Sequence, residues 1–163
     1  MVYKYYLGLG SNIDPRIDYL KKACRLLSRS GSIIQKSGLY QTQAWGNHNQ
    51  ADFFNAILEF NSSLSPQKLL KEIKNIEILI GRCKKVKWEP REVDIDIILC
   101  RNCNINEPDL KIPHPLFAQR RFVLVPLAEL DNRIHIVPYN KSVSELLDTC
   151  PDQSYIQKIE AVW

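Results

Sequence analysis

Two aspartates separated by a single residue form the most informative local pattern of the sequence. Asp94 and Asp96 lie in the segment 91–99, REVDIDIIL, whose composition and alternation predict a strand. Residues two apart on a strand point to the same side, so the two carboxylates share one face. Because Mg²⁺ is usually held by one or two carboxylates together with substrate phosphates, the pattern indicates a magnesium site. The alternative is a strand face whose acidic residues are simply solvated. Glu92 lies on the same face as the two aspartates, and we expect it to be solvated.

A basic segment precedes this strand and also carries a tryptophan. Arginine clamps phosphate through two parallel hydrogen bonds, whereas lysine acts as a point charge. The indole of Trp88 offers a flat face on which a planar ring can stack. The alternative is a solvated loop with Trp88 in the core, but the position just before the paired carboxylates favours a metal–polyphosphate complex. The charged residues of the segment are Arg82, Lys84, Lys85, Lys87, Glu89 and Arg91.

A histidine between two prolines is the third candidate. Pro113 and Pro115 restrict the backbone on either side of His114, and Arg120 and Arg121 follow shortly after. His114 can donate to a phosphate oxygen, although a rigid surface turn is the alternative interpretation.

The C-x-x-C pair, Cys100 and Cys103, is a weaker signal. A structural zinc site needs two more ligands at a sensible spacing, and the sequence holds no second pair. Cys83 and His114 are the remaining possibilities, so zinc binding or redox chemistry is disfavoured.

Composition sets the class of protein. The chain has 163 residues, 45% of them hydrophobic and 25% charged, which suits one globular domain over residues 1–163. The net charge of +4 permits a nucleotide or nucleic-acid partner without requiring one. The start resembles no secretory signal, and no apolar run is long enough to span a bilayer. We therefore expect a cytoplasmic protein, with its five cysteines as free thiols.

The candidate residues must be positioned by an alternation of strands and helices. Apolar spacing, together with glycine and proline signals, predicts the order β-α-β-β-α-β up to residue 100. This order indicates a ferredoxin-like α+β core, an antiparallel sheet flanked by helices, with a C-terminal elaboration. The expected strands are 3–8, 32–43, 53–60, 92–100 and an edge strand 154–161; the expected helices are 15–29, 66–80, 122–130 and 142–148, the first capped by Asp14; 44–52 and 102–109 are expected to be a loop and a turn region.

Seven motifs together resemble the 6-hydroxymethyl-7,8-dihydropterin pyrophosphokinase family of folate biosynthesis, from residue 7 to about residue 130. The element W-x-P-R-x-x-D-x-D is highly specific, and the order of all seven makes chance agreement improbable. The motifs are LGLGSN at 7–12, S-x-L-Y-x-T at 37–42, D-F-x-N at 52–55, I-E-x-x-x-G-R at 76–82, W-x-P-R-x-x-D-x-D at 88–96, P-H-P at 113–115 and R-x-F-V-L-x-P-L at 120–127.

The resemblance implies an enzyme that transfers diphosphate from ATP to the hydroxymethyl group of the dihydropterin, with two Mg²⁺ ions. It implies no nucleic-acid or membrane partner, and it allows an association with the next folate-pathway enzyme. The implied site residues are Asp94 and Asp96 for the metal ions, Arg82 and Arg91 for catalysis, Glu77, Lys84, His114 and Arg120 for ATP, and Thr42, Asn55, Trp88 and Phe122 for the pterin.

Three positions depart from the family pattern. Gln43 stands where proline is frequent, Phe53 lacks a hydroxyl that some members carry, and Lys84 replaces a second loop arginine. There are two alternatives to the enzyme: an RNA-binding module that uses the basic segment and Trp88, and a paralogue that binds nucleotide without turnover. The absence of an aromatic RNA-reading strand motif disfavours the first. The complete set of carboxylates and arginines disfavours the second.

Overall fold

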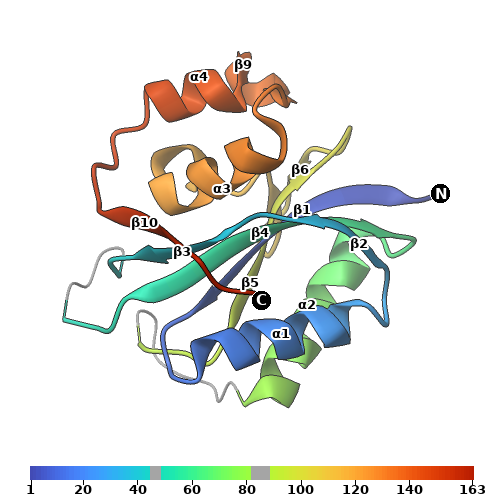
Figure 1. Ribbon diagram of the computed structural model, residues 1–163. Coiled ribbons are helices and arrows are strands. Elements are labelled where there is room, and N and C mark those ends of the chain that lie inside the picture. Colours follow the sequence, from blue (N-terminus) through green and yellow to red (C-terminus); the bar gives the residue numbers. More distant parts are fainter. Residues whose placement is uncertain (45–48, 82–88) are drawn as a thin grey trace.

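The computed structural model describes residues 1–44, 49–81 and 89–163 (Figure 1). The predicted order of strands and helices up to residue 100 is confirmed, with one predicted strand divided in two. The strands are β1 (Tyr3–Ser11), β2 (Ser32–Lys36), β3 (Leu39–Thr42), β4 (Phe53–Ser62), β5 (Asp94–Cys100), β6 (Ile105–Asn106), β7 (Lys111–Ile112), β8 (His135–Ile136), β9 (Lys141–Ser142) and β10 (Ile156–Ile159). The helices are α1 (Arg16–Leu27), α2 (Pro66–Ile80), α3 (Arg121–Asp131) and α4 (Val143–Asp148), with short 3₁₀ helices at Phe117–Gln119 and Val137–Tyr139.

The main sheet has the strand order β10-β3-β4-β1-β5, and β2 also pairs with β4. Every pairing in it is antiparallel. With β2 and β3 counted as one strand, this is the order expected for a ferredoxin-like core, to which β10 adds an edge strand. The predicted α+β class is therefore confirmed, and β5, which carries the two aspartates, is the other edge.

Helices cover both faces of this sheet (Figure 1). The apolar sides of α1 and α2 pack with one set of buried strand residues, among them Leu7, Leu9 and Ile95. The apolar sides of α3 and α4 pack with another set on the opposite face, among them Ile57 and Ile98. Because residues alternate along a strand, Asp94 and Asp96 share the side of Ile98 and so face α3.

The first strand is longer than predicted. Gly8 and Gly10 were expected to end it, but β1 continues to Ser11. The lack of a side chain explains the glycine at position 10, because a Cβ atom there would lie 2.8 Å from Oδ1 of Asn55. The two glycines thus open the α3 face of the sheet instead of breaking the strand.

The predicted strand 32–43 is divided at Ser37 and Gly38. The backbone N–H of Ile57 donates to Oγ of Ser37 at 2.9 Å, so a side chain interrupts the backbone ladder. The N–H of Gly38 donates to the carboxylate of Glu129 on α3. In both cases a backbone N–H donates to a side chain and not to a neighbouring strand, which explains the break between β2 and β3.

The helix starts and stops were predicted with mixed success. Asp14 does not cap α1: Pro15 occupies the cap position and Asp14 instead pairs with Arg16. Gly81 ends α2 with a positive φ of 131°, as its sequence position indicated. Ser142 and Glu145 form the predicted capping box at the start of α4.

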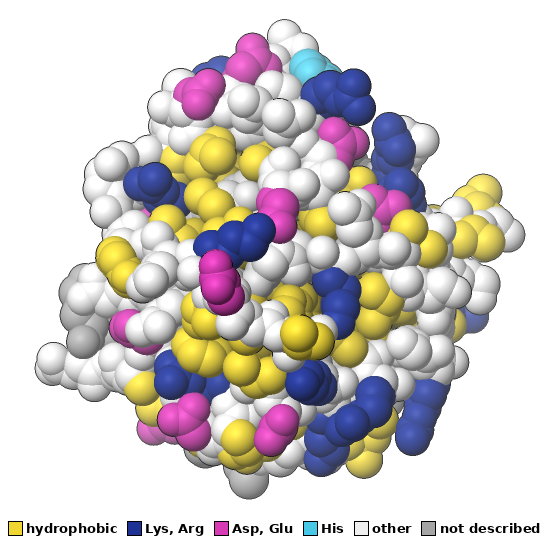
Figure 2. Space-filling model, in the orientation of Figure 1, with side chains coloured by type: hydrophobic (Ala, Val, Ile, Leu, Met, Phe, Trp, Pro, Cys, Tyr) yellow, Lys and Arg dark blue, Asp and Glu magenta, His cyan; other side chains and the backbone are white. Residues whose placement is uncertain are grey.

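Basic side chains gather in the lower part of Figure 2, around α1 and α2. Across the described ranges 1–44, 49–81 and 89–163, no helix is both long and apolar enough to cross a membrane.

Candidate functional site

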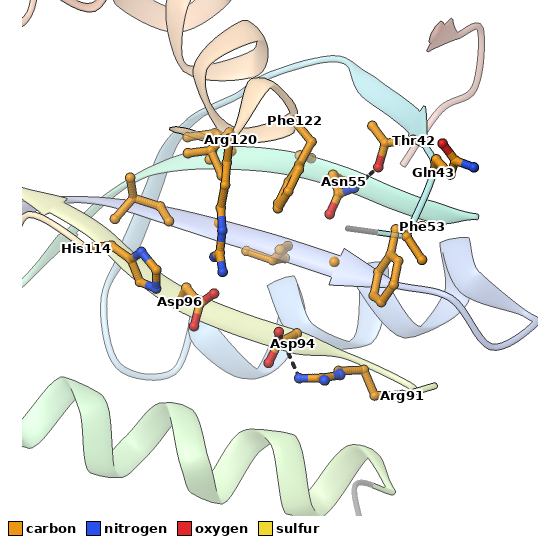
Figure 3. A pocket seen from close by; sticks show the side chains of 18 of the residues that line it. Thr42, Gln43, Phe53, Asn55, Arg91, Asp94, Asp96, His114, Arg120 and Phe122 are labelled. Atoms are coloured by element: carbon orange, nitrogen blue, oxygen red, sulfur yellow. Dashed lines mark hydrogen bonds and ion pairs between the residues drawn. The ribbon is translucent and has the colours of Figure 1, made fainter. Parts of the chain in front are cut away.

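A cavity of about 320 Å³ lies on the α3 face of the sheet (Figure 3). Its floor comes from β1, β4 and β5, and its walls come from the ends of β3 and α3 and from the segment before β5. Most of the described residues that the sequence singled out meet here. These are Thr42, Asn55, Arg91, Asp94, Asp96, His114, Arg120 and Phe122.

The two aspartates stand side by side at one end of the cavity (Figure 3). Oδ2 of Asp94 accepts from the guanidinium of Arg91 at 3.1 Å. Burial, followed by the negative charge of Asp94, raises the pKa of Asp96 to about 7. Among the residues the structure describes, no group of three or more His, Cys, Asp or Glu side chains could hold a metal ion. A cation here would therefore depend on these two carboxylates and on oxygen atoms of a ligand.

The histidine between the prolines is half-buried beside Asp96 and lines the cavity (Figure 3). Its Nδ1 accepts from the backbone N–H of Leu116 at 3.2 Å, which leaves Nε2 to carry the proton of the neutral ring. Burial, and then the positive charge of Arg120, lowers the pKa of His114 to about 4. His114 is therefore a neutral N–H donor at pH 7, and not a cation.

The guanidinium of Arg120 points toward the two carboxylates (Figure 3). Burial lowers its pKa, while the charges of Asp96 and Asp94 raise it in opposition. The group also lies 5.7 Å from the centre of the Phe122 ring. Arg120 thus connects the acidic end of the cavity with its aromatic end.

The other end of the cavity combines two aromatic rings with a buried amide. Nδ2 of Asn55 donates to Oγ1 of Thr42 at 2.7 Å, which fixes the orientation of the amide. The rings of Phe53 and Phe122 both point into the cavity, with Asn55 between them (Figure 3). Sequence reasoning missed Phe53 as a site residue, although its position two residues before Asn55 in the D-F-x-N motif was available as a signal.

Glu77 does not line this cavity. It is almost fully buried at 1% exposure, and its Oε1 accepts from the backbone N–H of Ile95 at 2.9 Å. Its Oε2 pairs at 3.0 Å with Lys74, which does line the cavity and which sequence reasoning missed. Glu77 therefore holds the free edge of β5 to α2 at Ile95, the residue between the two aspartates. Nucleotide contact by Glu77 stays a prediction.

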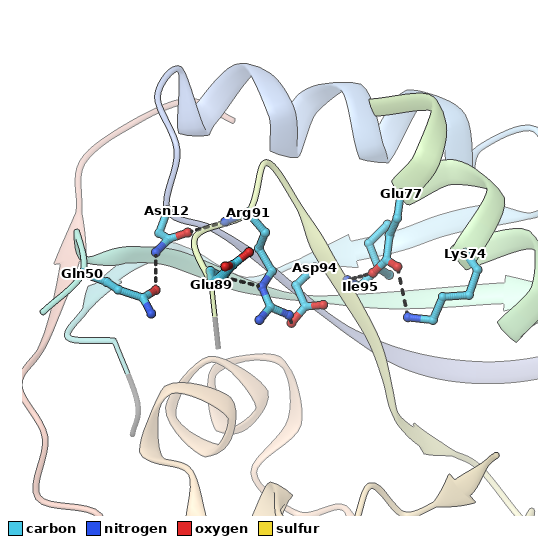
Figure 4. A network of polar contacts seen from close by, with 8 residues as sticks. All are labelled: Asn12, Gln50, Lys74, Glu77, Glu89, Arg91, Asp94 and Ile95. Atoms are coloured by element: carbon cyan, nitrogen blue, oxygen red, sulfur yellow. Dashed lines mark hydrogen bonds and ion pairs between the residues drawn. The ribbon is translucent and has the colours of Figure 1, made fainter. Parts of the chain in front are cut away.

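A buried asparagine connects the cavity walls (Figure 4). Oδ1 of Asn12 accepts from the backbone N–H of Arg91 at 2.8 Å, and Nδ2 of Asn12 donates to Gln50 and to the carbonyl of Ala51. Asn12 thereby fixes the backbone of Arg91 against the segment that leads into β4.

Three predicted site residues lie outside the described part of the chain. They are Arg82, Lys84 and Trp88. Their assigned roles stay predictions.

The sequence matches a family model, "7,8-dihydro-6-hydroxymethylpterin-pyrophosphokinase", over residues 6–132. The chain belongs to this family. Curated relatives carry the name 2-amino-4-hydroxy-6-hydroxymethyldihydropteridine pyrophosphokinase. The protein from Aquifex aeolicus is 44% identical over 86% of this chain and 88% of its own length. The protein from Bacillus subtilis is 40% identical over 79% of this chain and 78% of its own length.

Two longer proteins also match. The Lactococcus lactis subsp. cremoris protein named "Bifunctional protein FolKE" is 42% identical over 77% of this chain and 36% of its own length. The crystal structure of Plasmodium falciparum HPPK-DHPS A437G with SDX-DHP superposes with a TM-score of 0.73 and 16% identity. It covers 91% of this chain, which spans less than half (45%) of that solved chain. This likeness supports the pyrophosphokinase fold alone.

Proposed function

We propose that this protein transfers diphosphate from ATP to the hydroxymethyl group of 6-hydroxymethyl-7,8-dihydropterin in folate biosynthesis. The products are AMP and the pterin diphosphate. The observation that carries the proposal is that one cavity joins a carboxylate pair and cationic side chains to an amide between two aromatic rings. The first end suits a metal–polyphosphate complex and the second suits a flat heterocycle. Family membership favours this enzyme over an RNA-binding module.

The pterin is assigned to the aromatic end. Phe53 and Phe122 offer two ring faces for stacking, and Trp88 remains a further candidate. Because Nδ2 of Asn55 is engaged by Thr42, the Oδ1 atom is available to accept from an N–H on the edge of the pterin.

The ATP phosphates and two Mg²⁺ ions are assigned to the acidic end. Asp94 and Asp96 fit this role, because they share one strand face and open onto a cavity wide enough for ligand oxygens. The ions would neutralise charge that develops on the transferred group. Arg82, Arg91, Lys84, His114 and Arg120 are proposed to hold the phosphates, with the Nε2–H of His114 as a neutral donor.

The chain's own residues act by positioning. The hydroxymethyl oxygen attacks the β-phosphorus of ATP and releases its proton to solvent, the bond from that phosphorus to the oxygen bridging to the α-phosphorus breaks, and AMP leaves with that oxygen. No covalent enzyme intermediate is needed, so alignment and charge stabilisation account for the rate. Asn55 and the phenylalanine rings fix the acceptor, while Arg120 and His114 face the phosphates.

Identification of the nucleotide product tests the proposal. The protein is incubated with ATP, Mg²⁺ and the hydroxymethyl-dihydropterin, and the nucleotides are separated by chromatography. AMP formed in equal amount to the pterin diphosphate is the expected result. ADP would indicate transfer of a single phosphoryl group and would refute the proposal, as would the absence of any pterin-dependent product.

A cytoplasmic location remains the expectation from the sequence. Association with another folate-pathway enzyme is supported by similarity to the bifunctional FolKE protein. Co-purification with the enzyme that uses the pterin diphosphate would test it.

A further inference from the structure

The first turn of α3 carries side chains of the cavity but cannot cap itself. Arg120 occupies the cap position, has no acceptor atom in its side chain and makes no cap hydrogen bond through it. Arg120, Phe122 and Val123 all line the cavity. Because the first N–H groups of a helix have no partner within it, the geometry of this turn depends on groups from elsewhere.

A distant aspartate supplies the missing acceptor. The backbone N–H of Arg121 donates to Oδ2 of Asp152 at 2.9 Å, and the N–H of Ser154 donates to Oδ1 at 2.9 Å. Both carboxylate oxygens are thus fixed, and a negative charge at a helix N-terminus is also favourable. Burial raises the pKa of Asp152, but the hydrogen bonds from Ser154 and Arg121 outweigh it, so that the pKa is lowered.

The segment that begins at Asp152 then reaches the opposite wall. In β10, Ile156 pairs with Thr42 of β3, at the aromatic end of the cavity. Nζ of Lys158 donates to Glu129 of α3 at 2.8 Å. Residues 152–159 therefore connect α3 with β3, and they lie beyond residues 6–132 that match the family model.

We propose that Asp152 is a positioning residue that holds the first turn of α3, and with it Arg120 and Phe122, over the cavity. The proposal rests on the proposed function. Without the carboxylate, each binding event must also order this turn. The Michaelis constant for the pterin should then rise, while kcat at saturation changes less.

Steady-state kinetics of three variants test this role. Asp152→Ala should raise KM for the pterin roughly 2- to 30-fold, the range that loss of a helix cap allows. In Asp152→Asn the amide oxygen can still accept one N–H, so KM should rise less than in the alanine variant but measurably. Asp148→Ala removes an exposed aspartate at the end of α4 and should leave KM unchanged.

The outcomes separate positioning from mere stability and from the proposed function. A fall in kcat with unchanged KM, in proportion to the loss of folded protein, would overturn the positioning role. If the alanine variant does not fold, an unchanged KM in Asp152→Asn would overturn it equally. A wild-type protein that forms no AMP refutes the proposed function instead. In that case faster hydrogen exchange at the Arg121 amide of Asp152→Asn supports the cap, and unchanged exchange refutes it.

Discussion

The two aspartates of β5 are held close together by the strand itself. Their side chains share a face, and burial with mutual repulsion raises the pKa of Asp96. Such a pair lowers the stability of the fold unless a bound ligand compensates its charge, because like charges in a buried site oppose ionisation. At the scale of single residues, this pair is the strongest reason to assign a cation to the acidic end of the cavity.

We predict that Asp94→Ala or Asp96→Ala reduces turnover below detection, because each carboxylate would position a metal ion that neutralises transferred charge. The fold should persist, as judged by circular dichroism and cooperative unfolding. Asp109→Ala, which removes an exposed aspartate that does not line the cavity, serves as the matched control and should retain full activity. Near-normal turnover of either cavity variant at saturating Mg²⁺ would refute the assignment.

Phe53 and Phe122 should contribute to the binding of the pterin and not to that of ATP. Phe53→Ala or Phe122→Ala should weaken pterin binding by about 1–3 kcal/mol, by analogy with base–aromatic stacking. ATP affinity should change much less. Fluorescence titration with each ligand separately provides the measurement. Equal losses for both ligands would mean that the rings support the structure and do not stack on the pterin.

At the scale of elements, α2 secures the strand that carries the aspartates. β5 is an edge strand, so the N–H of Ile95 has no neighbouring strand on its outer side and donates to Glu77 instead. A buried acceptor that replaces a strand in this way cannot be removed without leaving a donor unsatisfied. The structure thus offers a role for Glu77 that the sequence motif alone did not indicate.

A pair of substitutions at Glu77 tests this role. Glu77→Leu should destabilise the protein by about 1–3 kcal/mol more than Glu77→Gln, because the amide oxygen can still accept from Ile95. Urea unfolding of both variants measures the difference in free energy of unfolding. If the two variants are equally stable while only ATP affinity falls, Glu77 contacts the nucleotide and does not secure β5.

The sequence predicted the elements better than their ends. Strong periodicity located α2 and β5, and the Ser142–Glu145 spacing predicted the capping box because that signal is entirely local. The break at Ser37 was missed, because it depends on a hydrogen bond from Gly38 to a helix 91 residues away. The extension of β1 was missed because Gly10 is required by a side chain on a neighbouring strand.

The site was predictable to a similar extent and for similar reasons. Asp94, Asp96 and His114 were found because motif and spacing mark them directly. Lys74 and Asn12 were missed as site residues, because only the folded chain brings them to the cavity or to Arg91. Asp152 lies outside every motif, and it contacts Arg121 of α3 from 31 positions away in the chain.

At the scale of the whole molecule, the C-terminal segment joins the two layers that form the cavity. Oε2 of Glu129 accepts from the hydroxyl of Tyr40 at 2.6 Å, and Oε1 accepts from Lys158 at 2.8 Å. The N–H of Gly38 also donates to this carboxylate. One acidic group on α3 therefore contacts both β10 and the chain around β3, at the side of the sheet opposite β5.

This carboxylate should make stability depend on pH in a defined window. Burial raises the pKa of Glu129, but hydrogen bonds from Lys158, Tyr40 and Gly38 lower it more, so the folded pKa lies below the ordinary value of 4.5. A group with a depressed folded pKa stabilises the fold above its unfolded pKa and ceases to do so as pH falls through the folded one. We expect Glu129→Gln to be less stable than wild type near pH 7. The deficit in free energy of unfolding should shrink as pH falls below 4.5.

Urea unfolding of wild type and Glu129→Gln at a series of pH values measures this deficit directly. Glu160→Gln provides the matched control, because Glu160 is an exposed carboxylate just after β10 and its replacement should leave the free energy of unfolding unchanged. A deficit for Glu129→Gln that is the same at all pH values would mean that the amide destabilises the fold because of its shape. The lost charge would then not be the cause, and the ionised carboxylate would not be what joins α3 to the C-terminal segment. A deficit that follows the titration of Glu129 would show that the charge itself stabilises this junction.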